Sequence, residues 1–199
     1  MWPSNNLPPE HDLHVQDWIR QYTSNGDVFY DIGANTGMMS KVAMDSGALV
    51  IAFKPVPSAC VEIGKFLHYP HKIINCAVWS ESCLLPMRLY PESGQSEIGD
   101  RADSPIEFYT AAMALKDMHL PKPTILKSDA QGAEVHILKG CLENGKDIVL
   151  NDCKVMILEF YGPGIAELGT LKKEFWDLTK YLGFVQIDKI GRDVLFVRQ

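Results

Sequence analysis

The chain has 199 residues, of which 46% are hydrophobic and 22% charged, and this composition fits one globular domain with a single substantial core. Its formal net charge of -6 and its pI near 5.5 argue against a nucleic-acid backbone as the main partner, because neutralising phosphates requires a basic face. We therefore predict a single domain over residues 1–199 and expect no nucleic-acid partner.

The cysteines and the N-terminal residues indicate an intracellular chain without a metal framework. None of the five cysteines stands in a Cys-x-x-Cys pair, so neither disulfides nor a structural zinc site is indicated, and a cytoplasmic setting is expected. The start of the chain lacks the pattern of a secretory signal, and no segment is long enough to span a membrane. Two histidine pairs have helical spacing, and we interpret both as structural: His11 with His14, and His68 with His71.

The first half of the chain predicts helices alternating with strands. A helix in the N-terminal region, residues 1–26, ends at the stop signal Ser24-Asn25-Gly26. The run Ala48–Phe53 is apolar throughout, which is typical of a strand buried on both faces. The expected elements are a helix over 10–22, a strand over 27–31, a helix over 38–46, a strand over 48–53, a helix over 58–67 and a strand over 72–78.

The second half continues the alternation after a long insert over residues 79–123. The expected elements are a strand over 124–129, a helix over 132–139, a strand over 155–160, a helix over 168–182 and two strands over 184–188 and 194–197. The short turn at Gly191 requires the last two strands to form an antiparallel hairpin, because parallel neighbours need a long crossover. The earlier alternation of strands and helices implies an α/β fold with a mostly parallel sheet.

The turn Asp31-Ile32-Gly33-Ala34-Asn35-Thr36-Gly37 carries the most functional information. An apolar strand that ends in an acid and a glycine-rich turn delivers a nucleotide to the N-terminus of the next helix. A dinucleotide fingerprint has glycines at its first, third and sixth positions, whereas Gly33 and Gly37 stand four apart. The spacing therefore favours S-adenosylmethionine over NAD.

Four blocks of the sequence resemble the FkbM methyltransferase family in order and spacing: residues 31–37, 52–57, 125–140 and 157–160. The family has the three-layer, Rossmann-like class I fold, with a mostly parallel seven-stranded sheet and an antiparallel C-terminal hairpin strand. The resemblance implies an S-adenosylmethionine-dependent O-methyltransferase that releases S-adenosylhomocysteine. The expected acceptor is a sugar hydroxyl in a glycan, on a deoxysugar such as rhamnose or fucose, and the chain is suited to stand as one module of a larger glycan-synthesising enzyme.

Two positions depart from the family pattern. Lys54 stands where a glutamate usually accepts hydrogen bonds from the cofactor ribose, and a lysine cannot accept them. It can donate to the ribose oxygens, favour a phosphorylated ribose or mark lost affinity, and we favour weakened but retained binding. Gln131 replaces a glutamate of the Lys-x-Asp-x-Glu-Gly-x-Glu motif, whose other members are retained.

The candidate site residues follow the carboxyl ends of the strands, where ligands bind in open α/β sheets. The candidates for cofactor binding are Asp31, Gly33, Ala34, Asn35, Gly37, Lys54, Cys76, Ala77 and Asp129. The catalytic candidates are Asp129, Lys127, Glu134, Glu159 and His136.

The proposed chemistry distributes roles among the catalytic candidates. A sugar hydroxyl is a weak acid, so a carboxylate or an imidazole must take its proton, and Asp129 is our first choice. Lys127 can orient the acceptor oxygen or pair with a neighbouring acid. Glu134 lies in the first turn of a predicted helix and fits a capping role equally well, and His136 fits local packing. Asp129 and Glu159 also permit a divalent cation, but two carboxylates without a ligand motif do not indicate one, so no metal is assigned.

The insert over residues 79–123 is expected to select the substrate, because long loops above a rigid sheet usually do so. The substrate-binding candidates are Tyr90, Arg101, Tyr109 and Tyr161. Aromatic faces and an arginine suit a sugar ring, although at least half of the insert's aromatics are equally suited to pack it onto the sheet.

Two alternative functions stay open at this stage. Lys127, Asp129 and Glu159 partly resemble a Lys-Asp-Lys-Glu tetrad, which would indicate 2′-O-methylation of RNA, although the acidic balance counts against RNA. The departures at Lys54 and Gln131 would also fit a degenerate, non-catalytic methyltransferase fold that serves as an interaction module. The sequence does not predict the oligomeric state.

Overall fold

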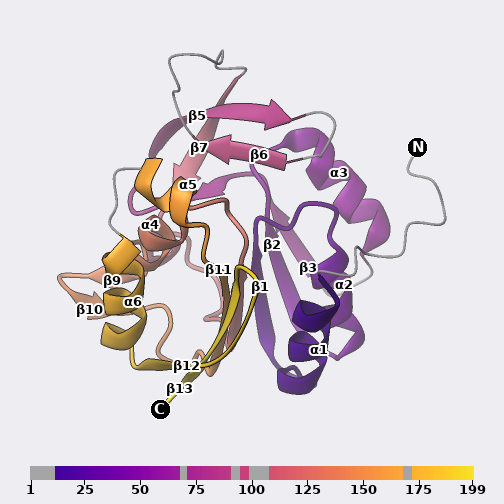
Figure 1. The fold of residues 1–199 in the computed structure, drawn as a ribbon. Helices are drawn as coiled ribbons and strands as arrows, with labels where there is room; N and C mark the ends of the chain where they lie inside the picture. Colours follow the sequence, from indigo (N-terminus) through magenta and orange to yellow (C-terminus); the bar gives the residue numbers. More distant parts are fainter. Residues whose placement is uncertain (1–11, 68–70, 91–94, 99–107, 168–171) are drawn as a thin grey trace.

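The structure is a computed structural model, and it describes residues 12–67, 71–90, 95–98, 108–167 and 172–199. In these ranges the chain forms a seven-stranded sheet with helices on both faces and a four-stranded sheet at one end (Figure 1). None of the helices in the described ranges combines the length and the apolar character needed to cross a bilayer.

The large sheet has the strand order β12-β13-β11-β8-β1-β2-β3. Its strands are β1 (Val28–Ile32), β2 (Leu49–Phe53), β3 (His71–Ile74), β8 (Ile125–Ser128), β11 (Val155–Glu159), β12 (Phe184–Ile190) and β13 (Asp193–Arg198). The strands from β3 to β11 pair in parallel, and β13 runs antiparallel to both β11 and β12. This arrangement confirms the predicted fold class, including the antiparallel hairpin at the end of the chain.

Helices cover the two faces of the large sheet in separate groups (Figure 1). One group is α1 (Leu13–Tyr22), α2 (Met38–Asp45) and α3 (Pro57–Phe66), and the other is α4 (Glu134–Lys139), α5 (Gly162–Glu167) and α6 (Lys172–Tyr181). Each group encloses its own cluster of buried apolar side chains. Because successive side chains alternate across a strand, Phe29 packs with the first group and Tyr30 with the second.

The central strands are mainly apolar because both faces of the sheet are covered. In β2, Val50, Ile51, Ala52 and Phe53 are all buried, and every residue of β11 is buried. Polar residues gather at the end of the sheet where the parallel strands finish. Asp31 lies near the end of β1, and Glu159 is the last residue of β11. The strands therefore form an apolar support that delivers polar side chains to one edge.

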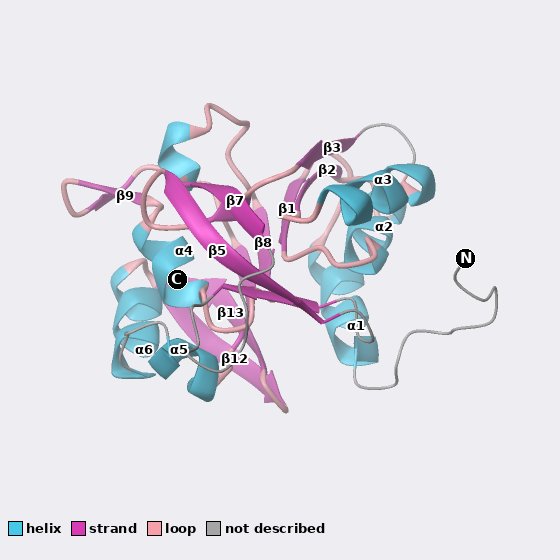
Figure 2. Ribbon diagram, turned by 90° about the horizontal axis from the view of Figure 1, so that it is seen from above, coloured by secondary structure: helices cyan, strands magenta, loops and turns pink. Residues whose placement is uncertain are grey.

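The insert and the two residues before it form a second sheet, which the sequence analysis did not predict. Its strands are β4 (Ala77–Val78), β5 (Cys83–Tyr90), β6 (Gln95–Ile98) and β7 (Phe108–Met113), in the order β4-β7-β5-β6. Seen from above in Figure 2, β5 and β7 lie over the end of the large sheet. The predicted strand 72–78 is divided, because the chain leaves the large sheet after Ile74 and joins the small one at Ala77.

The remaining differences concern short elements. The helix α5 was not predicted, and of the predicted helix 168–182 only α6 falls within the described residues. A short 3-10 helix (η2, Leu115–Asp117) follows the insert. A small hairpin follows α4 and consists of β9 (Leu142–Glu143) and β10 (Lys146–Asp147). Its turn is Asn144-Gly145, a dipeptide that favours tight hairpin turns because both residues have positive φ.

Candidate active site

The glycine turn after β1 approaches the loop after β8 very closely. A Cβ atom built on Gly33 would lie 2.1 Å from the carbonyl oxygen of Asp129, and the φ of Gly33 is +77°, so both space and backbone conformation require glycine. The amides of Gly33 and Ala34 donate to the carbonyl oxygen of Phe53, at 3.1 and 3.2 Å. These bonds tie the ends of β1 and β2 together below the turn.

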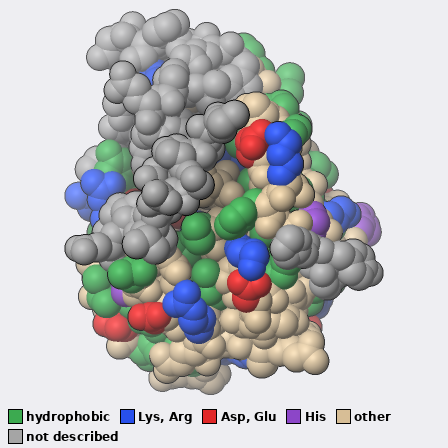
Figure 3. Space-filling view, turned by 90° about the vertical axis from the view of Figure 1, so that its right-hand side faces the viewer, with side chains coloured by type: hydrophobic (Ala, Val, Ile, Leu, Met, Phe, Trp, Pro, Cys, Tyr) green, Lys and Arg blue, Asp and Glu red, His purple; other side chains and the backbone are tan. Residues whose placement is uncertain are grey.

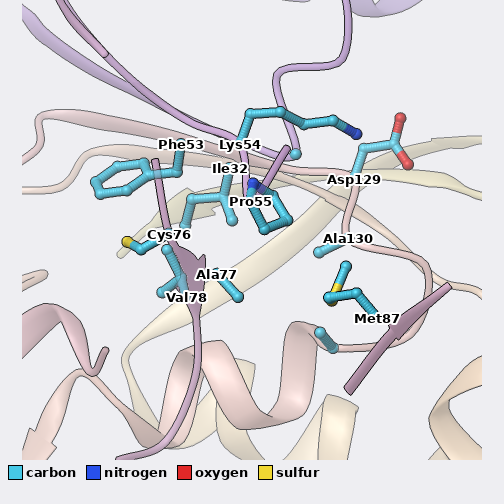
Figure 4. A pocket seen from close by; sticks show the side chains of 12 residues that line it. Ile32, Phe53, Lys54, Pro55, Cys76, Ala77, Val78, Met87, Asp129 and Ala130 are labelled. Atoms are coloured by element: carbon cyan, nitrogen blue, oxygen red, sulfur yellow. The ribbon is translucent and has the colours of Figure 1, made fainter. Parts of the chain in front are cut away.

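A pocket opens beside this turn (Figure 4). Five of the nine candidates for cofactor binding line it: Gly33, Lys54, Cys76, Ala77 and Asp129. Met87 of the small sheet and Ile32 of β1 add apolar walls. The other four candidates do not line the pocket: Asp31 and Ala34 are buried, Gly37 packs against Ile63, and Asn35 is exposed.

Asp31 and Lys127 form a buried ion pair near the ends of β1 and β8. The two residues are paired in register on β1 and β8, and Lys127 Nζ lies 3.3 Å from Asp31 Oδ1. The hydroxyl of Ser40 donates to the other oxygen of Asp31 at 2.7 Å. Burial alone would lower the pKa of Lys127, but the carboxylates of Asp31 and Asp129 outweigh it and raise the pKa. Lys127 therefore stays charged, and Asp31 serves as its buried partner.

Lys54 brings a second buried cation to the pocket. It follows β2 directly, is only 5% exposed, and in Figure 4 its ammonium group points toward the carboxylate of Asp129. Burial lowers the pKa of Lys54, while the charge of Asp129 opposes that change. The backbone carbonyl of Lys54 accepts a hydrogen bond from the side-chain amide of Asn75 at 2.9 Å, which fixes this position of the chain.

Asp129, Gln131 and Glu159 are joined by hydrogen bonds beyond the ends of β8 and β11. The amide nitrogen of Gln131 donates to Asp129 Oδ1 at 2.9 Å and to Glu159 Oε2 at 3.2 Å. Lys127 Nζ is 3.9 Å from Asp129 Oδ2, and Arg192 lies 3.5 Å from Glu159 Oε1. Burial raises the pKa of Glu159, and the nearby carboxylates of Asp129 and Glu134 raise it further.

Glu134 and His136, two of the catalytic candidates, have structural partners. The carboxylate of Glu134 is fully buried and accepts hydrogen bonds from the backbone amides of Ala130 and Gly132, at 2.8 and 3.0 Å. Burial raises the pKa of Glu134 to about 7, although these donors favour the ionised form. His136 stacks on Trp79, with the ring centroids 3.7 Å apart. Glu134 thus anchors the loop after β8, and His136 packs at the base of the insert.

The substrate-binding candidates are distributed unevenly. Tyr161 follows β11, and the guanidinium group of Arg192 lies 4.4 Å from its ring centroid, beside Glu159. Tyr109 is 62% exposed on the face of the small sheet opposite to Met87, because Tyr109 pairs with Pro86 and adjacent residues alternate faces. Arg101 and the side chain of Tyr90 lie outside the described residues.

Three residues at this edge were not among the site residues predicted from the sequence. His14 Nε2 lies 2.8 Å from Asp193 Oδ2, and this contact joins the start of α1 to the start of β13. Asp193 pairs in register with Glu159, and burial raises its pKa. Arg192 precedes Asp193 in the hairpin turn. A signal was present, because Gly191-Arg192-Asp193 is a charged turn at a predicted strand end, but His14 was interpreted as structural.

The described residues contain no group of three or more histidine, cysteine, aspartate or glutamate side chains placed to hold a metal ion.

Figure 3 shows the face that carries α2 and α3, where basic side chains lie beside acidic ones. Two such pairs are Lys41 with Asp45 on α2 and Lys65 with Glu62 on α3.

Comparison with known proteins adds a family and a set of similar folds. The model of the methyltransferase FkbM domain matches residues 31–185. A methyltransferase FkbM from Methylobacillus flagellatus KT has a TM-score of 0.56 and 14% identity, over 87% of this chain and 44% of that protein. The chain thus spans less than half the length of that relative. No curated protein matches the sequence.

Two further solved structures share the fold at low identity. A ribosomal protein L11 methylase from Lactobacillus delbrueckii subsp. bulgaricus has a TM-score of 0.57 and 10% identity, over 97% of this chain and 81% of that one. An rRNA methylase from Streptococcus thermophilus has a TM-score of 0.52 and 8% identity, over 97% of this chain and 99% of that one. These structures differ in what their descriptions say they methylate, so they support the shared fold and not a substrate.

Proposed function

The chain belongs to the FkbM methyltransferase family, and from that membership we propose that it transfers a methyl group from S-adenosylmethionine to a hydroxyl oxygen of a sugar. The acceptor we propose is a deoxysugar unit of a glycan, and the chain can act alone or as one module of a larger glycan-synthesising enzyme. The observation that carries the proposal is the position of Asp129, whose exposed carboxylate lines the pocket beside the buried cation Lys127.

The residues around the pocket fit the proposed cofactor, with one departure. Gly33 keeps the turn open where any side chain would meet Asp129, and Cys76, Ala77 and Met87 supply apolar surface for an adenine ring. Lys54 is the departure, because its ammonium can donate to ribose oxygens but cannot accept from ribose hydroxyls. When bound, S-adenosylmethionine supplies an electrophilic methyl group on a positively charged sulfur.

The chain's own contribution to the reaction is the removal of a proton from the acceptor. Asp129 is the base we propose, because its side chain is 43% exposed, lines the pocket and lies 3.9 Å from the ammonium of Lys127. It takes the hydroxyl proton as the acceptor oxygen gains the methyl group. Arg192 contacts both Tyr161 and Glu159 next to this carboxylate, and we propose that Tyr161 and Arg192 contact the sugar ring.

The first experiment is calorimetric titration of the purified chain with S-adenosylmethionine and S-adenosylhomocysteine. We expect saturable binding by the wild type and about tenfold tighter binding by Lys54→Glu, which regains an acceptor for the ribose hydroxyls. Lys54→Met is the matched control, because it keeps the length of the side chain without charge or hydrogen bonds. If wild type fails to bind and Lys54→Glu binds, the chain is a degenerate methyltransferase fold and the enzymatic proposal fails.

The acceptor is tested by transfer of a labelled methyl group to a panel of sugars and glycans, with RNA as a parallel arm. We expect transfer to a sugar hydroxyl and its loss in Asp129→Asn. RNA remains the second candidate because Lys127, Asp129 and Glu159 lie together at the sheet edge. The net charge of -6 argues against it. Transfer to RNA with no transfer to sugars would replace the proposal.

A further inference from the structure

Gln131 adopts a backbone conformation that side chains rarely accept. Its φ is +55°, in the left-handed region, and it is followed by Gly132 with a φ of +104°. A left-handed residue other than glycine costs about 1–2 kcal/mol, so the surrounding structure must hold it in place. Glu134 does this, because its carboxylate accepts from the amides of Ala130 and Gly132 on either side of Gln131. Glu134 therefore holds the backbone of the loop, and the side chain of Gln131 is not needed for that role.

That side chain joins two acids from neighbouring strands. β8 and β11 pair in parallel up to Ser128 and Leu158, so Asp129 and Glu159 each stand one position beyond the last pair. Two carboxylates at adjacent strand ends repel each other when both are ionised. The single amide nitrogen of Gln131 donates to one oxygen of each, at 2.9 and 3.2 Å. One donor shared in this way holds the two acids together.

The two carboxyl groups meet different surroundings. The side chain of Asp129 is 43% exposed and faces Lys127, whereas that of Glu159 is 9% exposed and meets Arg192, which is itself 59% exposed. Arg192 favours an ionised Glu159, but water screens the charge of so exposed a guanidinium. The other charged groups that act on the pair are Lys54 after β2, Glu134 on α4 and Asp193 at the start of β13.

We propose that Gln131 is a positioning residue that clamps Asp129 and Glu159 side by side, so that the pair carries one negative charge and Asp129 presents it to the acceptor. The proposal rests on the proposed function for its catalytic meaning, but the clamp itself is a property of the free protein. Glu159 then acts as the protonated partner that keeps Asp129 in place, and burial supports this assignment by raising the pKa of Glu159.

The clamp predicts a specific coupling between the two acids. Glutamate and aspartate labelled with ¹³C at the side-chain carboxyl are titrated by NMR, and Glu159→Gln identifies the Glu159 signal. In the protein that keeps Gln131, Asp129→Asn should lower the titration midpoint of Glu159 by about one pH unit or more, because a neighbouring negative charge is lost. In the Gln131→Met background, Asp129 is released toward solvent, and the same substitution should move the midpoint by less than half as much.

Gln131→Met is the matched variant, because methionine has nearly the same length, pays the same left-handed backbone cost and lacks the amide. Equal shifts in the two backgrounds would overturn the clamp, as would a wild-type Glu159 that titrates at an ordinary glutamate pH. If Gln131→Met does not fold, Gln131→Glu replaces it. That variant also removes the donor, so Asp129→Asn should again move the Glu159 midpoint by less than half as much as in the protein with Gln131, and an equal shift would overturn the proposal.

The catalytic meaning of the clamp is measured separately from its existence. In methyl transfer, Gln131→Met should lower kcat at least tenfold and shift its pH profile, with the calorimetric affinity for S-adenosylmethionine changed less than twofold. Equal kcat and pH profile in wild type and Gln131→Met would remove the positioning role. If the wild type neither binds the cofactor nor transfers methyl groups while the coupling is observed, the proposed function fails and the clamp stands.

Discussion

The contact between Gly33 and the loop after β8 gives the sharpest test of the site geometry. In Gly33→Ala the new Cβ would lie 2.1 Å from the carbonyl oxygen of Asp129 and 2.9 Å from its carbonyl carbon. Both partner atoms belong to the backbone, so relief requires the loop or the turn to move. Alanine at a φ of +77° also costs about 1–2 kcal/mol, and overpacking adds about 1–3 kcal/mol. We expect Gly33→Ala to lose about 2–5 kcal/mol of unfolding free energy.

Gly145→Ala is the matched control for this prediction. Gly145 has a φ of +73°, nearly that of Gly33, but an added Cβ would meet nothing within 4 Å. It should therefore lose only the conformational cost, about 1–2 kcal/mol. Urea unfolding followed by linear extrapolation measures both variants on one scale. The difference between them isolates the close approach of the turn to the loop after β8.

Cofactor binding supplies the second readout. Gly33→Ala displaces Asp129 and the pocket wall, so it should weaken binding of S-adenosylmethionine by at least tenfold, whereas Gly145→Ala lies in a distant hairpin and should leave affinity unchanged. Equal losses of stability in the two variants, within about 0.5 kcal/mol, would refute the argued approach of the two loops. So would a Gly33→Ala protein that binds the cofactor as the wild type does.

Two further predictions concern the buried charges. Asp31→Asn keeps an acceptor for Ser40 but leaves Lys127 without its buried anion. The free energy of unfolding measured in urea should therefore fall by about 3 kcal/mol. A fall below about 1 kcal/mol would contradict the ion pair. The pKa of Glu134 is raised from 4.5 to about 7, so its contribution to stability is present below pH 4.5 and is lost as the pH rises through 7. The free energy of unfolding should fall by about 3 kcal/mol between pH 5 and pH 8, with Glu159 acting in the same direction, and Glu159→Gln should reduce the fall. A flat profile in urea titrations across this range would count against both assignments.

The succession of strands and helices along the chain was predictable because the sequence signals that mark each element are local. Apolar runs such as Ala48–Phe53 mark strands that are covered on both faces, and Gly47 and Gly183 mark the ends of the helices before the following strands. The turn Gly33–Gly37 pointed to the sheet edge at which we propose that the cofactor binds, and the positions of Asp129 and Glu159 after their strands predicted that both lie at that edge. These inferences need only the neighbouring residues and the rule that ligands bind beyond parallel strand ends.

The small sheet was not predictable in the same way because its pairing depends on distant residues. β5 pairs with β7 across the middle of the insert, and β4 is a two-residue bridge to β7. The alternation in β5, where Pro86 interrupts the run, does not stand out from a loop, and the two residues of β4 fell inside the predicted strand 72–78 with no local sign that they pair with β7. The end of β3 at Ile74 and the start of β4 at Ala77 follow from this pairing and not from the apolar run itself.

The side-chain contacts of the site depended on three-dimensional features that the motifs do not contain. His14 meets Asp193 across 179 positions of sequence, and a histidine at helical spacing alone gives no sign of that partner. The bridging role of Gln131 depends on its left-handed backbone, which no local residue pattern demanded. Glu134 was weighed between catalysis and capping, and its contacts to two backbone amides support the structural role.

Exposure distinguishes Asp129 from three other acids near this edge: Asp31, Glu134 and Glu159. Asp31 and Glu134 are fully buried, and both are held by fixed partners, the ammonium of Lys127 for the first and two backbone amides for the second. Glu159 is 9% exposed at its side chain, and its burial favours the protonated form. Asp129 has a side chain that is 43% exposed and lines the pocket, and its Oδ2 lies 3.9 Å from Lys127 Nζ. A base must be within reach of its substrate, and among these four acids Asp129 is the one that combines an exposed side chain with a place in the pocket lining, which is why we propose it as the base.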